Sequence, residues 1–204
     1  VYLYRSGFAR FSNSRFSTHK DDICNNYIHL TNVAVQKMGA NYDAATGMKW
    51  ALRDLKLFLL SRHPADLVHQ AFLAIESLIL RSLLAVANTI INDKHSFELY
   101  GYDIMIDDRL KPWLIEVNSS PSLTSDTPAD HELKCTMLHD TLDLIDMEQR
   151  VAAGIPRSHV GGFDLIWDGG PVVHEDRYDL CPSFLGTHNP QLQSEYQTSA
   201  EGQA

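Results

Sequence analysis

The run WLIEVN, apolar except for Glu116 and Asn118, predicts a β-strand over residues 113–118. In such a strand Glu116 and Asn118 point to the same face, because successive side chains alternate between the two faces. The segment just upstream, FELYGYDIMID at residues 97–107, also has the pattern of a strand, and the residues that follow it can form a tight turn. We therefore predict an antiparallel hairpin in which Asp103 lies opposite Glu116.

This hairpin would place the side-chain oxygens of Asp103, Glu116 and Asn118 together on one face of a sheet. Two carboxylates and a carboxamide suit a hard cation such as Mg²⁺, which fills its other positions with water or phosphate oxygens. A purely structural reading stays open, in which Asp103 caps the turn region and Glu116 is a solvated residue of an edge strand. No calcium-binding loop spacing is present.

Apolar residues at helical spacing predict three helices. The first covers residues 50–60, the second starts after Pro64 and runs to about residue 90, and the third starts at Thr127-Pro128 and runs to about residue 150. The apolar stripe of the second helix is read as core. The alternative, an amphipathic membrane helix, is disfavoured because its other face lacks a band of Lys and Arg.

The remaining segments are predicted to be strands and loops. Residues 2–11 and 27–35 read as strands, the second interrupted by Thr31 and Asn32, and residues 37–49 read as a mobile loop. Two polar side chains between apolar residues indicate either contact with a ligand or a strand end that bonds its own backbone. Residues 151–190 are predicted to be a docked loop extension, and the Gln- and Ser-rich residues 191–204 a disordered tail.

Composition is that of a globular protein: the chain has 204 residues, 44% of them hydrophobic and 21% charged. It begins with Val1 and its longest apolar stretch is broken by Arg81, so we expect a soluble fragment without a membrane partner. Three widely separated cysteines suggest neither a disulfide framework nor a zinc site and fit a reducing cytosol.

The net charge of −9 argues against nucleic acid as the main partner. The charge is uneven, with seven acids and two bases from residue 151 onward, and with no acid among the first 20 residues. Those 20 residues hold Arg5, Arg10, Arg15 and Lys20, which could face an anion or form an ordinary solvated surface.

Familiar nucleotide and nucleophile motifs are absent. The sequence has no glycine-rich Walker loop, no Gly-x-Gly-x-x-Gly and no nucleophile elbow around Ser119-Ser120. What remains is a magnesium–phosphate site on an antiparallel sheet, in which catalysis comes from positioning and charge neutralisation. Candidate donors to the phosphates are Arg10, Thr31, Asn32 and Lys49.

Four motifs in order, YRSGFARFS, YIHLTNVAVQK, ELYGYDIMID and WLIEVNSSPSL, resemble the tubulin–tyrosine-ligase-like family and, within it, the glutamylases. The resemblance implies an α+β, ATP-grasp fold that binds ATP and Mg²⁺. Residues 1–150 would be its C-terminal part, with an antiparallel sheet and packed helices and with the N-terminal lobe missing. The later segment GGFDLIWDGGP resembles a non-autonomous glutamylase subgroup associated with cilia and flagella.

The family's chemistry implies roles for particular residues. ATP phosphorylates a glutamate side chain in the acidic tubulin tail, and the amine of free L-glutamate then attacks the acyl phosphate. By match to the family motifs, Asp103, Glu116 and Asn118 would bind magnesium, Thr31 and Asn32 would approach ATP, and Arg10 would bind the amino acid or stabilise the acyl phosphate. Arg10 and Glu116 are therefore the predicted catalytic residues. Lys49 would contribute to the glutamate site, and Ser119, where chain-elongating members tend to have histidine, favours initiation of the branch.

The resemblance also implies a partner-dependent enzyme. We expect this C-terminal half to be inactive alone, and the full protein to act with accessory subunits on microtubules in the cytoplasm, at the axoneme or basal body of a cilium or flagellum. The acidic segment after residue 150 should repel tubulin, which favours such subunits. Two alternatives remain: a glycylase of the same fold, and a non-catalytic tubulin or ciliary scaffold.

Overall fold

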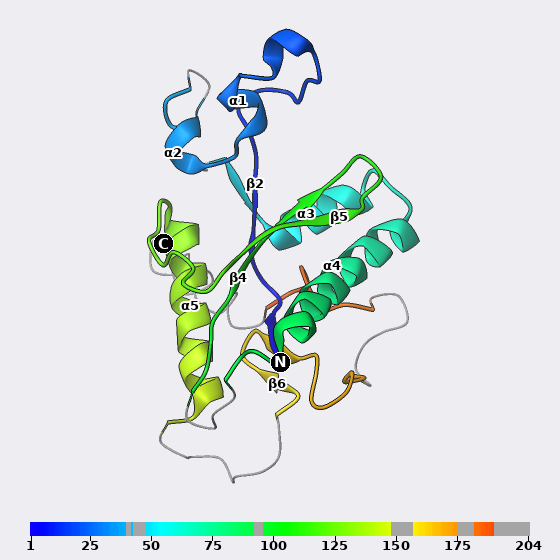
Figure 1. Cartoon of the computed structure of the whole chain (residues 1–204), viewed down its shortest axis with the longest axis vertical. Helices are drawn as coiled ribbons and strands as arrows, with labels where there is room; N and C mark the ends of the chain where they lie inside the picture. The colour runs from blue at the N-terminus through cyan, green and yellow to red at the C-terminus, as the bar shows by residue number, and fades with distance from the viewer. Residues whose placement is uncertain (40–41, 43–47, 92–95, 148–156, 175–181, 190–204) are drawn as a thin grey trace, which may run out of the picture.

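The computed structural model describes residues 1–39, 42, 48–91, 96–147, 157–174 and 182–189 (Figure 1). The strands are short and antiparallel, and they form three separate sheets ordered β1-β7-β6, β2-β3 and β4-β5. Their bounds are β1 Tyr2–Tyr4, β2 Phe8–Arg10, β3 Lys49–Ala51, β4 Gly101–Ile106, β5 Pro112–Asn118, β6 His159–Val160 and β7 Phe163–Leu165. The helices are η1 Lys20–Asp22, α1 Asn26–His29, α2 Val33–Gln36, α3 Leu52–Leu60, α4 Ala65–Val86 and α5 Pro128–Ile145. The predicted α+β class is confirmed.

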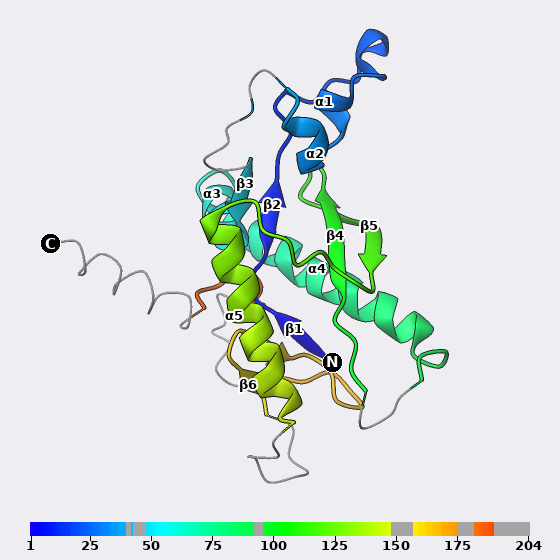
Figure 2. The same cartoon turned by 90° about the vertical axis from the view of Figure 1, so that its left-hand side faces the viewer.

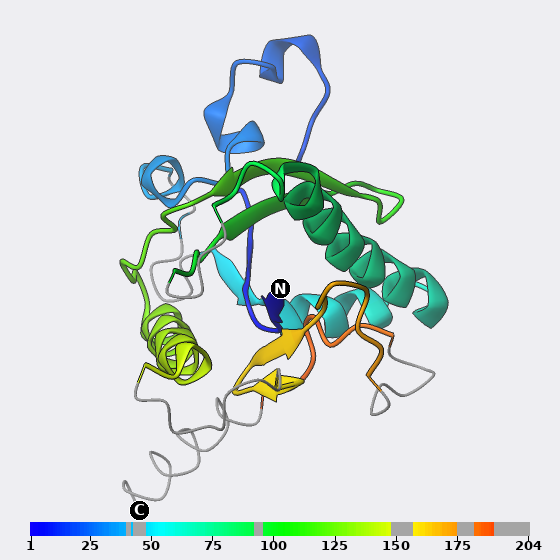
Figure 3. The same ribbon diagram turned by 60° about the horizontal axis from the view of Figure 1, so that its bottom comes forward.

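Among the described residues, helix α4 supplies five of the eight buried residues of the main hydrophobic cluster. Its side chains Val68, Phe72, Ile75 and Ile79 are buried and pack with residues of α3, the hairpin turn and the C-terminal extension. By length and composition α4 could cross a membrane, a test that the core helices of soluble proteins also pass. Its participation in this cluster agrees with the predicted core role. Helices α4 and α5 lie on opposite sides of the β1–β2 segment (Figures 1 and 3).

The three predicted helices are confirmed with shifted ends. Pro64 stands at the N-cap of α4, which ends at Val86, short of the predicted residue 90. The hydroxyl of Thr127 caps α5 by accepting the N–H of Asp130, as the Thr-Pro sequence predicted. That helix ends at Ile145, because Asp146 adopts a left-handed conformation with φ of 47°.

The strand predicted over residues 27–35 is wrong. The segment forms two single-turn helices, α1 and α2, which project from the rest of the molecule with the loop before them (Figures 1 and 2). The side chain of Asn25 caps α1 by accepting the N–H of Tyr27. The amide of buried Gln36 donates to the carbonyls of Tyr27 and Leu30 and so ties the two turns together. A short apolar run does not by itself distinguish strand from helix.

Three strands, β3, β6 and β7, were not predicted. Lys49 lies in β3, not in a loop, and pairs with Arg10 of β2. Strand β7, expected to be a loop, pairs along β1 with Leu165 opposite Tyr2 and so docks the C-terminal extension onto the first strand. Residues 40–41 and 43–47 of the loop predicted at 37–49, and all of the tail predicted at 191–204, lie outside the described residues.

We expect Phe72→Ala to destabilise the fold by about 3–5 kcal/mol, because Phe72 is completely buried among large apolar side chains. Leu84→Ala, at a partly exposed position of the same helix, should cost about 1 kcal/mol or less. Urea denaturation of the two variants measures the difference. Equal losses would contradict the placement of Phe72 in the core and of Leu84 at its edge.

Candidate active site

The β4–β5 hairpin has the register that the sequence predicted. Asp103 lies opposite Glu116, and Gly101 lies opposite Asn118. A β-bulge follows Asp103, so that the register shifts between Asp103 and Ile104. Because directly opposed residues share a face of the sheet, the carboxylates of Asp103 and Glu116 are on the same side.

Side-chain hydrogen bonds hold the turn of this hairpin. The carboxylate of Asp107 accepts the N–H groups of Arg109 and Lys111, each at 2.9 Å, and the indole N–H of Trp113 at 3.0 Å. The indole bond is the largest contribution that lowers the pKa of Asp107 below its ordinary value. Leu110, at φ 61°, is buried in the core. The turn is therefore anchored on both its polar and its apolar side.

An arginine from a distant segment reaches this acidic face. Nη2 of Arg10, at the end of β2, lies 2.6 Å from Oδ1 of Asp103. Both side chains remain more than a third exposed, at 38% and 36%. On β5 the amide of Asn118 donates to Oε1 of Glu116 at 3.2 Å. Four of the predicted residues thus form two contacting pairs, one within β5 and one between β2 and β4.

A broad groove collects most of the predicted site. Arg10, Thr31, Asn32, Asp103 and Glu116 all line it, although they come from the first strands, the α1–α2 junction and the hairpin. Asn32 occupies the N-cap position of α2 without a capping bond from its side chain. The groove therefore borders residues matched to ATP, to magnesium and to the amino acid, whereas Asn118, the third residue matched to magnesium, is not among its lining residues.

The other predicted substrate residues lie outside that lining. Ser119 is exposed, directly after β5. Lys49 is 10% exposed and lies opposite Arg10 in the β2–β3 pair, but its ammonium group contacts two aspartates. Neither position contradicts the predicted role, which stays a prediction.

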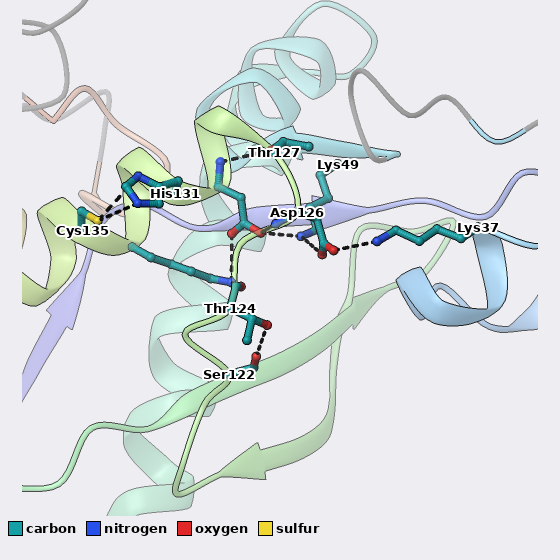
Figure 4. A network of polar contacts seen from close by, with 10 residues as sticks. Lys37, Lys49, Ser122, Thr124, Asp126, Thr127, His131 and Cys135 are labelled. Atoms are coloured by element: carbon teal, nitrogen blue, oxygen red, sulfur yellow. Dashed lines mark hydrogen bonds and ion pairs between the residues drawn. The ribbon is translucent and has the colours of Figure 1, made fainter.

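The lysine–aspartate network consists of Lys37, Lys49, Lys134, Asp126 and Asp130 (Figure 4). Nζ of Lys49 lies 2.8 Å from Oδ2 of Asp130 and 3.3 Å from Oδ2 of Asp126. Lys37 reaches Asp126 at 2.8 Å, and Lys134 reaches the other oxygen of Asp130 at 3.0 Å. The network ties β3 and α2 to the first turn of α5.

Asp130 is completely buried within this network. Burial alone raises the pKa of its carboxyl, but the bonds from Lys49, Lys134 and the N–H of Asp126 outweigh burial and lower it. The sequence did not single out Asp126 or Asp130. The sequence did contain one signal for Asp130: it follows the N-cap residue Thr127 by three positions. In a capping box, an acidic side chain at that position accepts an N–H from the backbone that precedes the helix, as Asp130 does from Asp126.

The predicted metal ligands fit a hard cation by donor type. Among the residues that the structure describes, no group of three or more His, Cys, Asp or Glu lies close enough to hold a metal ion. Asp103, Glu116 and Asn118 offer two carboxylates and one carboxamide instead. That set leaves positions for phosphate and water oxygens, as Mg²⁺ sites beside nucleotides do.

Comparison with known proteins identifies the family. The model of the tubulin-tyrosine ligase family matches residues 1–152. The chain belongs to the tubulin-tyrosine ligase family. The predicted resemblance is thereby confirmed, and residues 1–152 contain each site residue named above, including the lysine–aspartate network.

Individual relatives in this family carry more specific names. The chain is 51% identical over 176 residues to the probable tubulin polyglutamylase TTLL9 of Bos taurus, which covers 86% of this chain and 37% of that protein. It is 46% identical over 188 residues, 92% of this chain and 44% of the relative, to the probable tubulin polyglutamylase ttll-9 of Caenorhabditis elegans. Against the probable alpha-tubulin polyglutamylase Ttll1 of Tetrahymena thermophila the identity is 40% over 175 residues, 82% of this chain and 42% of that protein. The chain thus spans less than half the length of these curated relatives.

We expect acid to destabilise the wild-type protein more than Asp130→Asn. The pKa of Asp130 in the folded state lies below its ordinary value of 3.8, so its ionised form favours folding. That contribution is present above about pH 4 and is lost as the pH falls through the folded-state pKa. Thermal unfolding midpoints between about pH 6 and pH 3 measure it. Parallel curves for the two proteins would contradict the assignment.

Proposed function

We propose that the full-length protein is an ATP- and Mg²⁺-dependent ligase that adds L-glutamate to glutamate side chains in the C-terminal tails of tubulin. The proposal draws on the relatives named tubulin polyglutamylases. The observation that carries it is the face on which Asp103 opposes Glu116 while Arg10 contacts Asp103. That face offers ligands for a cation beside a guanidinium group. Phosphoryl transfer to a carboxylate needs such positive charge, because negative charge develops on the phosphate oxygens.

The proposed fold is ATP-grasp, of which this chain supplies the C-terminal part. Two carboxylates and a carboxamide on the β4–β5 hairpin would hold Mg²⁺, and Thr31 and Asn32 at the α1–α2 junction would approach the nucleotide. Bound there, the metal would neutralise negative charge on the phosphates. The groove lined by Thr31, Asn32, Asp103 and Glu116 supports the arrangement, because it borders both segments.

The proposed reaction has two steps. An oxygen of the acceptor carboxylate attacks the γ-phosphorus of ATP, and ADP leaves. The amine of free glutamate then attacks the acyl carbon, phosphate leaves, and the nitrogen loses a proton to give the isopeptide bond. Arg10 would hold a carboxylate of the incoming glutamate or the acyl phosphate, since a guanidinium can donate two parallel hydrogen bonds to such groups.

The remaining assignments are also proposals. Lys49 contributes positive charge beside Arg10, and Ser119, next to Asn118, favours starting a branch over extending one. Accessory subunits would bring the enzyme to microtubules in the cytoplasm, at the axoneme or basal body of a cilium or flagellum. The excess of acids after residue 150 supports this dependence, because it opposes direct contact with an acidic tubulin surface.

Glu116→Gln in the full-length protein should lower the rate of ligation on the order of 100-fold or more while leaving the fold intact, because it removes one proposed metal-binding charge at nearly constant volume. Radiolabelled glutamate incorporated into tubulin measures the rate. Asp108→Asn is the matched control, since Asp108 is an exposed acid in the turn of the same hairpin. Wild-type rates in the Glu116 variant would remove Glu116 from the site.

Arg10→Ala should raise the KM for glutamate about tenfold or more and change the KM for ATP much less, because it removes a charged hydrogen-bond donor from the amino acid. Arg15→Ala, an exposed arginine on the same basic segment, serves as the control. Steady-state kinetics with each substrate varied in turn separate the two constants. Equal increases in both would argue that Arg10 contacts the nucleotide instead.

A further inference from the structure

Asp130 differs from an ordinary helix-capping acid because its carboxylate pairs with two lysines. Its side chain is 0% exposed, yet it contacts two lysines from different elements, Lys49 of β3 and Lys134 of α5. It also accepts the backbone N–H of Asp126 at 3.1 Å. A buried carboxylate is costly to desolvate, and cations at this distance offset that cost. The position of each lysine is therefore coupled to that of Asp130.

The strand register extends this coupling to Arg10. Arg10 and Lys49 lie directly opposite one another in the β2–β3 pair. Like charges directly opposite in a sheet are destabilising unless each has a counterion. Asp103 neutralises Arg10 from the hairpin, and Asp130 and Asp126 neutralise Lys49 from the α5 side. Loss of the Asp130 charge would leave the two cations facing each other with one anion fewer.

Lys49 has few alternatives for its ammonium group. It is 10% exposed, and its Nζ also lies 5.4 Å from the centre of the Phe8 ring, on the strand that carries Arg10. Without the Asp130 carboxylate, Nζ would keep Asp126, which is 31% exposed and shared with Lys37. The ammonium group of Lys49 would then shift toward the more exposed Asp126 and away from the side chain of Arg10.

We propose that Asp130 is a positioning residue of the ligase: by fixing Lys49, it holds the cationic pair Arg10 and Lys49 in the geometry that binds the carboxylates of the amino-acid substrate. This inference rests on the proposed function. Asp130 touches no substrate and acts through Lys49. Its charge serves the amino-acid side of the site, whereas the Asp103–Glu116 face serves the nucleotide and metal side.

The test is Asp130→Asn in the full-length protein with its native associates. The expected result is a KM for glutamate raised about tenfold or more, with the KM for ATP changed less than threefold or so. A role confined to capping α5 would lower stability without separating the two constants. A double-mutant cycle with Lys49→Met should be non-additive, because both changes break the same ion pair.

Asp140→Asn is the matched control. Asp140 is an equally buried aspartate of α5, but it accepts the hydroxyl of Tyr4 at 3.1 Å and the N–H of Gly162 at 2.8 Å, on the extension side. It should lower the unfolding temperature and leave the KM for glutamate within about twofold of wild type. If Asp130→Asn does not fold, the pair Lys134→Met with Asp130→Asn, which removes one of the two cations left without the carboxylate and keeps Lys49, should fold and show the raised KM.

The outcomes separate this inference from the proposed function. Suppose that the wild type ligates glutamate and that a folded Asp130 variant shows an unchanged or lowered KM for glutamate. That result would overturn only the positioning role. Equal changes in the constants for glutamate and ATP would overturn it as well. No ligation by the wild-type protein with tubulin, ATP and Mg²⁺ would overturn the proposed function and this inference together.

Discussion

The register of the β4–β5 hairpin is the constraint on which the candidate site depends. A slip of one residue would turn Glu116 and Asn118 to the opposite face and separate them from Asp103. The turn prevents that slip because Asp107 binds three donors while Leu110 inserts into the core. Packing of α4 against β5 then holds the hairpin on the body of the protein. Local hydrogen bonds and a tertiary contact therefore specify the same arrangement.

Charge pairing joins this hairpin to the rest of the site. The amino-terminal ribbon of β2 and β3 carries two adjacent cations, and each is neutralised by an element from a different part of the chain. Arg10 meets the hairpin through Asp103, 93 residues away, and Lys49 meets α5 through Asp130, 81 residues away. In a chain with a net charge of −9, the two cations are thus held side by side by paired carboxylates. The carboxylates of Asp103, Asp126 and Asp130 fix the positions of these two cationic groups.

The sequence carried enough information for the parts of the fold that are local. Alternation and turn residues predicted the hairpin and the Asp103–Glu116 pairing, and helical spacing with a Thr-Pro cap predicted α5. The segment at 27–35 was misread because its apolar run is too short to set a period, and its actual structure depends on bonds from Gln36. Strands β3 and β7 pair with partners on β2 and β1, and such non-local pairing leaves no signal in either segment alone.

The candidate site residues divide in the same way, into those predicted from local sequence and those that only the fold brings together. Strand alternation and polar residues among apolar ones pointed to Arg10, Thr31, Asn32, Asp103 and Glu116, the family resemblance assigned their roles, and all five line one groove. Asp126 and Asp130 were missed because their significance comes from Lys49, which only the fold brings to them. Family motifs thus indicate candidate site residues directly, whereas residues that contact those candidates from distant segments become visible only in the structure.

The most direct test of the central claim is glutamate incorporation into tubulin by the full-length protein, purified with its native associates, with ATP and Mg²⁺ omitted one at a time. Incorporation only when both are present is the predicted result, since the Asp103–Glu116 face is assigned to a metal-bound nucleotide. Binding of tubulin without incorporation under complete conditions would contradict the account and favour a non-catalytic scaffold.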